Sequence, residues 1–264
     1  MAETVILKLG GSIITRKAEG RLEVDEKNLA RLAEETAQAL TKPGLKLVVV
    51  HGAGPFGHVL AEKYGLAEEK SNPMKIKGMA ETHASMEKLN AAVVSALARA
   101  GVAAIAFQPS AGGIMDNRVL VEFPVKVVKE MLDRNLTPVG YGDVLVDRKT
   151  GVNILSGDHL VPYLAEKIPA SRVVIATDVD GIYSGDPKDG GNPVKISKIT
   201  KENMGSVKLS GSKATDVTGG MQRKVKELVS LAEKGIHSRI ISGLKTGELA
   251  KALKGESGTG TLIE

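Results

Sequence analysis

Short apolar segments alternate along the chain with longer segments in which apolar residues recur at helical spacing. The strand-length segments are Val5–Leu9, Leu45–Val50, Val102–Phe107, Arg172–Thr177 and Ser238–Ser242. Between the first two, an apolar stripe runs from Leu29 to Leu40, and Asp25 precedes it as the expected N-cap of a helix. This alternation predicts an α/β fold with a mainly parallel sheet covered by helices.

Two other segments interrupt the alternation. Val144–Asp147 and Val152–Leu155 flank Arg148–Gly151, and this pattern predicts a β-hairpin. The stretch 183–212 is rich in Gly, Lys, Ser and Asp, so we expect surface loops with little regular structure there.

Composition narrows the classes of partner. The 264 residues are 42% hydrophobic and 25% charged, and no apolar run approaches the ~20 residues that span a bilayer, so no membrane partner is expected. Cys is 0, which excludes disulfides and thiolate metal sites and fits a cytoplasmic protein. Aromatic residues are 3% and Trp is 0, so a nucleic-acid partner is not expected. The net charge of +5 favours anionic small molecules.

The first candidate phosphate site is the segment in which Lys8 is followed by Gly10, Gly11 and Ser12 at the end of the first predicted strand. Glycines lack a Cβ atom, so a phosphate can approach the backbone and accept hydrogen bonds from its N–H groups. The ammonium groups of Lys8 and of Lys17, beyond the turn, would add positive charge. The alternative is a glycine turn beside two solvated lysines.

A second glycine-rich segment, residues 51–58 (His-Gly-Ala-Gly-Pro-Phe-Gly-His), follows the second strand. Its glycines satisfy G-x-G-x-x-G, the pattern of dinucleotide-binding folds. That pattern usually follows the first strand, and an acid ending another strand is expected about 20 residues on, where this chain reads as a loop. We therefore favour a phosphate contact at a helix start, with Pro55 at its first position and His58 in its first turn.

Two further segments place acidic residues beside glycines. In Ser156-Gly157-Asp158, Gly157 would let a substrate phosphate approach and Asp158 would hold lysines in place; the alternative is that Ser156 or Asp158 only caps a helix. From Asp178 to Asp186, a strand ends in small and acidic residues and a glycine, as expected where a sheet edge binds ribose and adenine. A calcium loop is excluded because its spacing and its closing Glu are absent.

A fifth motif, Asp216-Val217-Thr218-Gly219-Gly220, precedes a predicted amphipathic helix whose N-terminus would be another anion site. Lys224, about one turn in, would point along a phosphate chain. Helix capping by Asp216 or Thr218 explains this segment alone. The recurrence of glycine-and-lysine sites in one chain, however, predicts two phosphorylated ligands, as phosphoryl transfer requires.

Together these motifs resemble the amino acid kinase superfamily and, within it, the isopentenyl phosphate kinase family. The resemblance covers nearly the whole chain and also takes in Gln108-Pro109-Ser110, Tyr141-Gly142-Asp143-Val144 and Gly260-Thr261. It implies an open αβα sandwich, a homodimer, ATP with Mg²⁺, and phosphorylation of isopentenyl phosphate to isopentenyl diphosphate. We expect one domain over 1–264, with an acceptor-binding lobe over 1–165 and a nucleotide-binding lobe over 166–264.

The resemblance also implies roles for single residues. Lys8, Lys17 and Lys224 would stabilise the transferred group, and His58 would grip the acceptor phosphate. The implied ATP contacts are Lys8, Gly10, Gly11, Ser12, Asp178, Asp180, Gly181, Tyr183, Asp186, Gly220 and Lys224. The implied acceptor contacts are Gly52, Ala53, Gly54, Gly57, His58, Ser156, Gly157 and Asp158. No protein ligand for a metal is expected, because Mg²⁺ would bind mainly to the ATP phosphates.

An isoprenoid tail would need an apolar slot, for which Met74, Ile76, Met79, Met86 and Val93 are candidates, ordinary core packing being the alternative. The chain departs from the family's usual second motif at Ala53, where glycine is frequent, and at Pro55, which removes an amide donor. Fosfomycin kinase shares much of the pattern, so a small phosphonate is an alternative acceptor. An NAD-dependent oxidoreductase and a non-catalytic nucleotide sensor are the alternatives from other classes.

Overall fold

The protein is described here by a computed structural model, which covers residues 3–18, 21–68, 73–185, 193–205, 220–258 and 260–264. The strands are β1 (Glu3–Leu9), β2 (Thr15–Ala18), β3 (Arg21–Val24), β4 (Leu45–His51), β5 (Ala104–Ala106), β6 (Ile114–Asp116), β7 (Val119–Glu122), β8 (Thr137–Tyr141), β9 (Asp143–Asp147), β10 (Gly151–Leu155), β11 (Arg172–Thr177), β12 (Ile182–Tyr183), β13 (Lys195–Ile196), β14 (Lys198–Ile199), β15 (His237–Ser242) and β16 (Thr261–Ile263). The helices are α1 (Gly11–Ile14), α2 (Glu26–Leu40), α3 (Pro55–Lys63), α4 (Met74–Arg99), α5 (Val125–Asp133), α6 (Gly157–Lys167), α7 (Lys201–Met204), α8 (Gly220–Ala232) and α9 (Glu248–Lys254), with a 3-10 turn at Pro109–Ala111.

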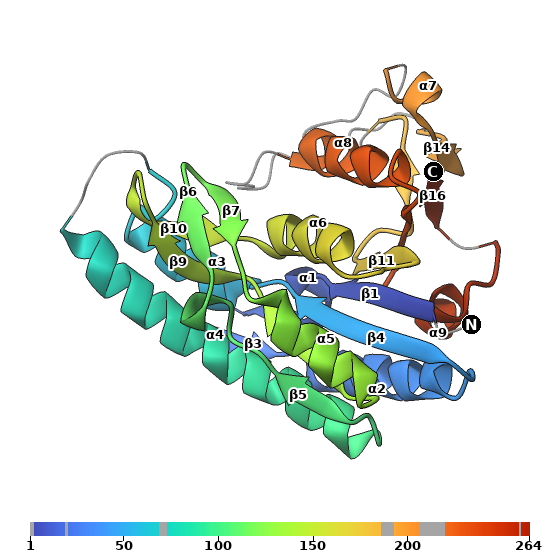
Figure 1. The fold of residues 1–264 in the computed structure, drawn as a ribbon, viewed down its shortest axis with the longest axis horizontal. Helices are drawn as coiled ribbons and strands as arrows, with labels where there is room; N and C mark the ends of the chain where they lie inside the picture. Colours follow the sequence, from blue (N-terminus) through green and yellow to red (C-terminus); the bar gives the residue numbers. More distant parts are fainter. Residues whose placement is uncertain (1–2, 19–20, 69–72, 186–192, 206–219, 259) are drawn as a thin grey trace.

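An eight-stranded sheet forms the centre of the molecule, in the order β14-β16-β15-β11-β1-β4-β8-β5 (Figure 1). Neighbouring strands are parallel except for β15 and β16, which run antiparallel. The predicted α/β class and mainly parallel sheet are therefore confirmed. Since β1 lies at the middle of this sheet, its carboxyl end opens among the ends of β4 and β11, where α/β folds place their sites.

Residues of β1 alternate between two hydrophobic layers, because successive side chains of a strand point to opposite faces of the sheet. Val5 and Leu7 pack in the cluster that contains the buried faces of α2, α4 and α9. Ile6 packs in the other cluster, with α5, α6 and α8. Figure 1 shows α6 and α8 on one side of the sheet and α2 and α4 on the other. By the same alternation Lys8 faces the α6 and α8 side.

Several local predictions are confirmed by the described backbone. Asp25 is the N-cap of α2, and its side chain accepts a hydrogen bond from the Asn28 amide at 3.1 Å. The hairpin forms as β9 and β10, and the carboxylate of Asp147 accepts bonds from the amides of Lys149 and Thr150 in its turn, at 2.9 Å each. Pro55 is the first residue of α3, where its missing N–H costs no helical bond.

Three features differ from the predictions. β8 was not expected, yet all five of its residues are buried and it separates β4 from β5. β5 is limited to Ala104–Ala106 within the longer apolar run. The stretch 183–212, expected to be loops, contains the short elements β13, β14 and α7 in its described part. Among the described helices, none is both long and apolar enough to cross a bilayer.

Candidate active site

The carboxyl ends of β1 and β4 meet backbone to backbone. A Cβ atom on Gly11 would lie 2.2 Å from the amide nitrogen of Gly54, and one on Gly52 would lie 2.7 Å from the nitrogen of Gly11. Gly54 has φ +52° and ψ −149°, and a Cβ there would lie 2.3 Å from Oγ1 of Thr15. Only glycine allows this conformation and this approach, so the two turns form one continuous floor.

Backbone amides in this floor are available to a ligand. Among the described residues, neither Ala53 nor Gly54 donates its amide to a backbone carbonyl. Gly54 is the N-cap of α3, whose partial positive charge adds to the attraction for an anion. His58 follows in the first turn of the same helix, and its side chain is exposed.

The start of α6 contributes a third glycine. A Cβ on Gly157 would lie 3.2 Å from Cε of Lys8 and 3.5 Å from Cγ1 of Val50, so its small size makes room for the lysine. Ser156 is the N-cap of α6, but its side chain makes no capping bond, and its Oγ has no hydrogen-bond partner in the described part of the chain. Ser156 therefore caps α6 through its backbone alone.

Lys8, Asp158 and Lys224 form an ion cluster between the sheet, α6 and α8. The Nζ atom of Lys8 lies 2.5 Å from Oδ1 of Asp158, and Nζ of Lys224 lies 3.7 Å from the same atom. The Lys8 side chain is 8% exposed and that of Asp158 is 23% exposed. Burial alone would raise the pKa of Asp158, but the charges of Lys8 and Lys224 outweigh it and lower this pKa to about 2. Asp158 is therefore an anion at neutral pH.

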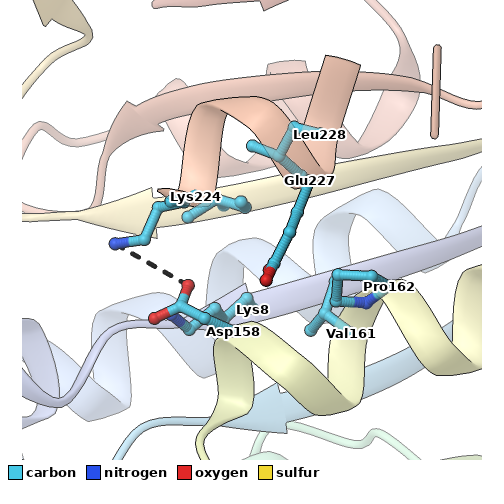
Figure 2. Close-up of a pocket in the computed structure, with 8 residues that line it drawn as sticks. Lys8, Asp158, Val161, Pro162, Lys224, Glu227 and Leu228 are labelled. Carbon is cyan, nitrogen blue, oxygen red and sulfur yellow. Dashed lines mark hydrogen bonds and ion pairs between the residues drawn. The ribbon is translucent and has the colours of Figure 1, made fainter. Parts of the chain in front are cut away.

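A small pocket opens beside this cluster (Figure 2). Apolar walls come from both helices and the sheet, through Val161, Pro162, Ile175 and Leu228. Lys224 extends from α8 toward Asp158, and Glu227, from the same helix, reaches toward the same space. Low polarisability of such walls strengthens every charge interaction inside the pocket.

A second charged cluster lies after β11. The carboxylate of Asp180 accepts hydrogen bonds from Tyr183 Oη at 2.5 Å, Lys245 Nζ at 2.8 Å and Lys195 Nζ at 3.3 Å. The bonds from Lys245 and Tyr183, against a smaller effect of burial, hold the pKa of Asp180 well below its usual range. Lys195 and Lys245 were missed by the sequence analysis, because both lie among other lysines and no spacing distinguishes them.

The remaining predicted site residues have different surroundings. Asp178 is exposed, and a Cβ on Gly181, with φ +144°, would lie 2.7 Å from Oγ1 of Thr261. Gly10 donates its amide to the Ala176 carbonyl at 2.8 Å, and Gly57 packs on Sδ of Met86. Ser12 is exposed in α1 and Gly220 begins α8. The Lys17 side chain, Asp186 and the 216–219 motif lie outside the described residues.

The candidate tail residues divide between two environments. Met86 and Val93 are fully buried in the core, and Met79 packs against a smaller cluster between α3, α4 and the β9–β10 hairpin. Met74 and Ile76 are exposed. The structure therefore brings these residues together in no single slot.

Two histidines without an assigned role make defined side-chain contacts. His51 is completely buried; burial lowers its pKa to about 4, although hydrogen bonds with Gly52 and Asn90 oppose the shift. His83 on α4 contacts the buried carboxylate of Asp143 through Nδ1 at 3.0 Å and the Gln108 amide through Nε2 at 3.0 Å. Among the described residues, no cluster of three or more His, Cys, Asp or Glu side chains is arranged for a metal ion.

The arrangement suits a multiply charged anion. Two amides that have no backbone acceptor in the described part of the chain lie after the sheet strands, as do the N-termini of α3 and α6, and one carboxylate in the first turn of α6 contacts two ammonium groups. Such fixed donors and cations stabilise the charge on a phosphoryl group during its transfer.

Comparisons with known proteins agree with this chemistry. The model of the amino acid kinase family matches residues 3–242. The isopentenyl phosphate kinase of Methanothermobacter thermautotrophicus is 37% identical over 266 residues, covering 98% of each chain. That of Methanocaldococcus jannaschii is 37% identical over 261 residues, covering 95% of each. A crystal structure of an isopentenyl phosphate kinase superimposes with a TM-score of 0.84 at 34% identity, over 99% of this chain and 100% of the other.

Proposed function

Because this chain belongs to the amino acid kinase family, and within it to the isopentenyl phosphate kinases, we propose that it transfers the γ-phosphoryl group of ATP to isopentenyl phosphate. An oxygen of the acceptor phosphate forms a bond to the γ-phosphorus, and the bond from that phosphorus to the β,γ-bridging oxygen breaks. The products are isopentenyl diphosphate and ADP.

The observation that carries the proposal is the shared contact of Lys8 and Lys224 with Asp158. The acceptor is already an anion, so the reaction needs positioning and charge neutralisation more than a general base. In our proposal the two ammonium groups neutralise the charge on the oxygens of the phosphoryl group during its transfer. Asp158 keeps the two ammonium groups at a fixed separation. Lys17, whose side chain lies outside the described residues, is proposed for the same role from the resemblance.

The acceptor phosphate is proposed to bind on the floor formed by the glycine turns. Gly11 and Gly54 bring the backbones of the two turns into contact, and the start of α6 lies beside them. His58, in the first turn of α3, would orient the acceptor. The segment from Asp178 to Asp186 and its charged cluster at Asp180 would contact the nucleotide, and the nucleotide-binding lobe is proposed to begin near residue 166.

Mg²⁺ is proposed to enter with ATP. Asp158, the carboxylate that contacts both lysines, is engaged by two cations, so it is a poor metal ligand. Mg²⁺ prefers phosphate oxygens and waters completed by one or two carboxylates, and it would supply further charge neutralisation on the phosphates. We assign it no ligand from the described residues.

A homodimer and a cytoplasmic location are also proposed, from the resemblance. The outer strand of the sheet, β5, leaves Ile105 42% exposed, and covering such an edge is a common reason for association. Light scattering of the purified protein tests the dimer, whose mass would be twice 27.7 kDa.

The activity is tested with a panel of acceptors in one assay of ADP release, with the product identified by phosphorus NMR. We expect kcat/KM for isopentenyl phosphate to exceed that for fosfomycin by about a hundredfold or more, because a built site rejects an acceptor that leaves its groups unpaired. Preference for fosfomycin would support the phosphonate alternative. Thermal stabilisation by NAD but not by Mg-ATP would support an oxidoreductase, and absence of turnover with every acceptor would support a nucleotide sensor.

A further inference from the structure

His51, the last residue of β4, directly precedes the glycine turn but has no part in the mechanism above. Its Nδ1 atom lies 3.0 Å from the carbonyl oxygen of Gly52, and its Nε2 atom lies 3.2 Å from Oδ1 of Asn90 on α4. The ring stacks on Tyr141, with centroids 5.6 Å apart and planes at 20°. Each edge and one face of the imidazole are therefore held.

These contacts define which ring nitrogen carries the proton. A carbonyl oxygen only accepts hydrogen bonds, so Nδ1 must be the protonated nitrogen of His51. The ring is neutral at pH 7 because burial depresses its basicity, and Nε2 must then be an acceptor. Asn90 can donate to Nε2 only through its NH₂ group. The amide is therefore turned so that its nitrogen, and not Oδ1, faces His51, and the two orientations have the same shape. Hydrogen bonds are therefore donated by Asn90 to His51 and by His51 to the Gly52 carbonyl.

The direction of the Gly52 carbonyl determines the direction of the next amide. His51 has the same strand parity as Leu47 and Val49, which pack in the cluster of α2 and α4. Because the Gly52 carbonyl oxygen lies 3.0 Å from Nδ1 of this ring, the carbonyl points to the same side of the sheet. Peptide groups are planar, and no cis bond occurs in the described chain, so the Ala53 N–H points the opposite way. That is the side on which Lys8 and Asp158 lie.

We propose that His51 is a positioning residue, which fixes the Gly52–Ala53 peptide so that the Ala53 amide is presented to the acceptor phosphate. The inference rests on the proposed function, in which Ala53 is already an implied acceptor contact, and adds the residue that orients its amide. Ala53 donates to no backbone carbonyl among the described residues, and Pro55 in the same turn has no N–H at all. Phosphate binding by this turn thus depends on a small number of N–H groups. Rotation of the Gly52–Ala53 peptide would remove one of these hydrogen-bond donors.

Three substitutions of His51 separate positioning from packing. His51→Asn places an N–H donor near the position of Nδ1, His51→Gln places one near Nε2, and His51→Phe keeps the ring that stacks on Tyr141. We expect KM for isopentenyl phosphate to rise about tenfold in the Gln and Phe variants and about threefold or less in the Asn variant, with KM for ATP unchanged. Equal acceptor KM in all three variants would overturn the proposal, whatever their stabilities.

A second measurement is independent of turnover. Nitrogen NMR of the neutral imidazoles distinguishes a protonated Nδ1 from a protonated Nε2, and comparison with His51→Phe assigns one of the five histidines. We expect His51 to carry its proton on Nδ1 at pH 7, and a proton on Nε2 would refute the proposed order of donors. If the wild-type chain fails to phosphorylate isopentenyl phosphate, the proposed function is lost while the tautomer result still stands.

Discussion

Lys8 and Lys224 contact the same oxygen atom of Asp158, although they come from the first strand and from α8 near the other end of the chain. One carboxylate thus sets the separation of two cations. Lys8 reaches Asp158 from β1, and Lys224 reaches Asp158 from α8, which covers the sheet (Figure 2).

Removal of either ammonium group is predicted to lower turnover. We expect Lys8→Ala and Lys224→Ala each to reduce kcat by about 10²–10³, because a fixed charge at the transferred group acts mainly in the transition state. Lys226→Ala is the matched control, since Lys226 is an exposed residue of the same helix. Steady-state assays of ADP release measure the effect, and unchanged kcat in Lys8→Ala would remove that lysine from the mechanism.

Asp158 is predicted to stabilise the fold in a pH-dependent way. Its pKa falls from 3.8 to about 2 on folding, so its contribution is complete above pH 4 and is lost as pH falls to about 2. This shift corresponds to about 2 kcal/mol of unfolding free energy. Urea denaturation of Asp158→Asn should show a deficit of that order at pH 6 that shrinks toward pH 2.

The control for this prediction is Glu166→Gln. Glu166 pairs with Lys234 at 2.7 Å, but their side chains are 40% and 52% exposed. Exposed ion pairs contribute about 0–1 kcal/mol, so the control should be near wild type. A deficit in Asp158→Asn that does not change between pH 6 and pH 2 would contradict the linkage.

His51 is predicted to make the protein sensitive to mild acid. Its pKa falls from 6.5 to about 4, so between these values the unfolded chain binds a proton that the folded chain does not. Stability therefore decreases as pH falls through this range, by about 3 kcal/mol in total. His51→Asn has no such proton to bind, and its unfolding free energy should fall less steeply from pH 6.5 to 4. Parallel pH profiles for the two proteins would exclude His51 as the source.

His58 is predicted to act on the acceptor. We expect His58→Ala to raise KM for isopentenyl phosphate by about tenfold or more while KM for ATP stays within about twofold, as expected for the loss of one hydrogen bond to a charged group. Val59→Ala, at the next and 56% exposed position of α3, is the control. An effect confined to ATP would reassign the histidine.

Gly54 is predicted to tolerate no side chain. Gly54→Ala combines a positive φ with a Cβ placed 2.3 Å from Oγ1 of Thr15, so we expect about 3 kcal/mol of destabilisation and loss of acceptor binding. Gly205→Ala is the control, because φ there is −66° and no atom lies within 4 Å of the added Cβ. Thermal melts measure the loss of stability in each variant, and we expect a loss in Gly54→Ala and little change in Gly205→Ala.

The sheet was predictable from sequence wherever its strands are long and apolar, as in β1, β4 and β11. β8 was not predicted, because Pro138 and Gly140 are residues that disfavour a central strand. The structure gives a reason for the glycine: a Cβ on Gly140 would lie 2.2 Å from Cζ of Phe107, so the strand leaves room for that ring. Such a requirement comes from packing between distant segments and leaves no local pattern.

The candidate site was predictable as motifs, and Asp158 was expected to hold lysines, which its contacts with Lys8 and Lys224 agree with; the geometry of the cluster was not predictable. Lys8, Asp158 and Lys224 each follow or accompany a glycine, which a reader of the sequence can see. Their meeting depends on the position of β1 in the sheet and on the packing of α8 over α6, which no spacing expresses. His51 carried no signal for its role, since its effect depends on the orientation of one peptide group.

The wide separation of Lys8 and Lys224 along the chain has a consequence during synthesis. A nascent polypeptide that has emerged only as far as α6 contains Lys8 and Asp158 but lacks the second ammonium group and the neighbouring strand β11. Turnover should therefore begin only after translation has passed α8 and that helix has docked. Chains released by the ribosome before that point lack Lys224, so we expect their turnover to be lower by about 10²–10³ or more.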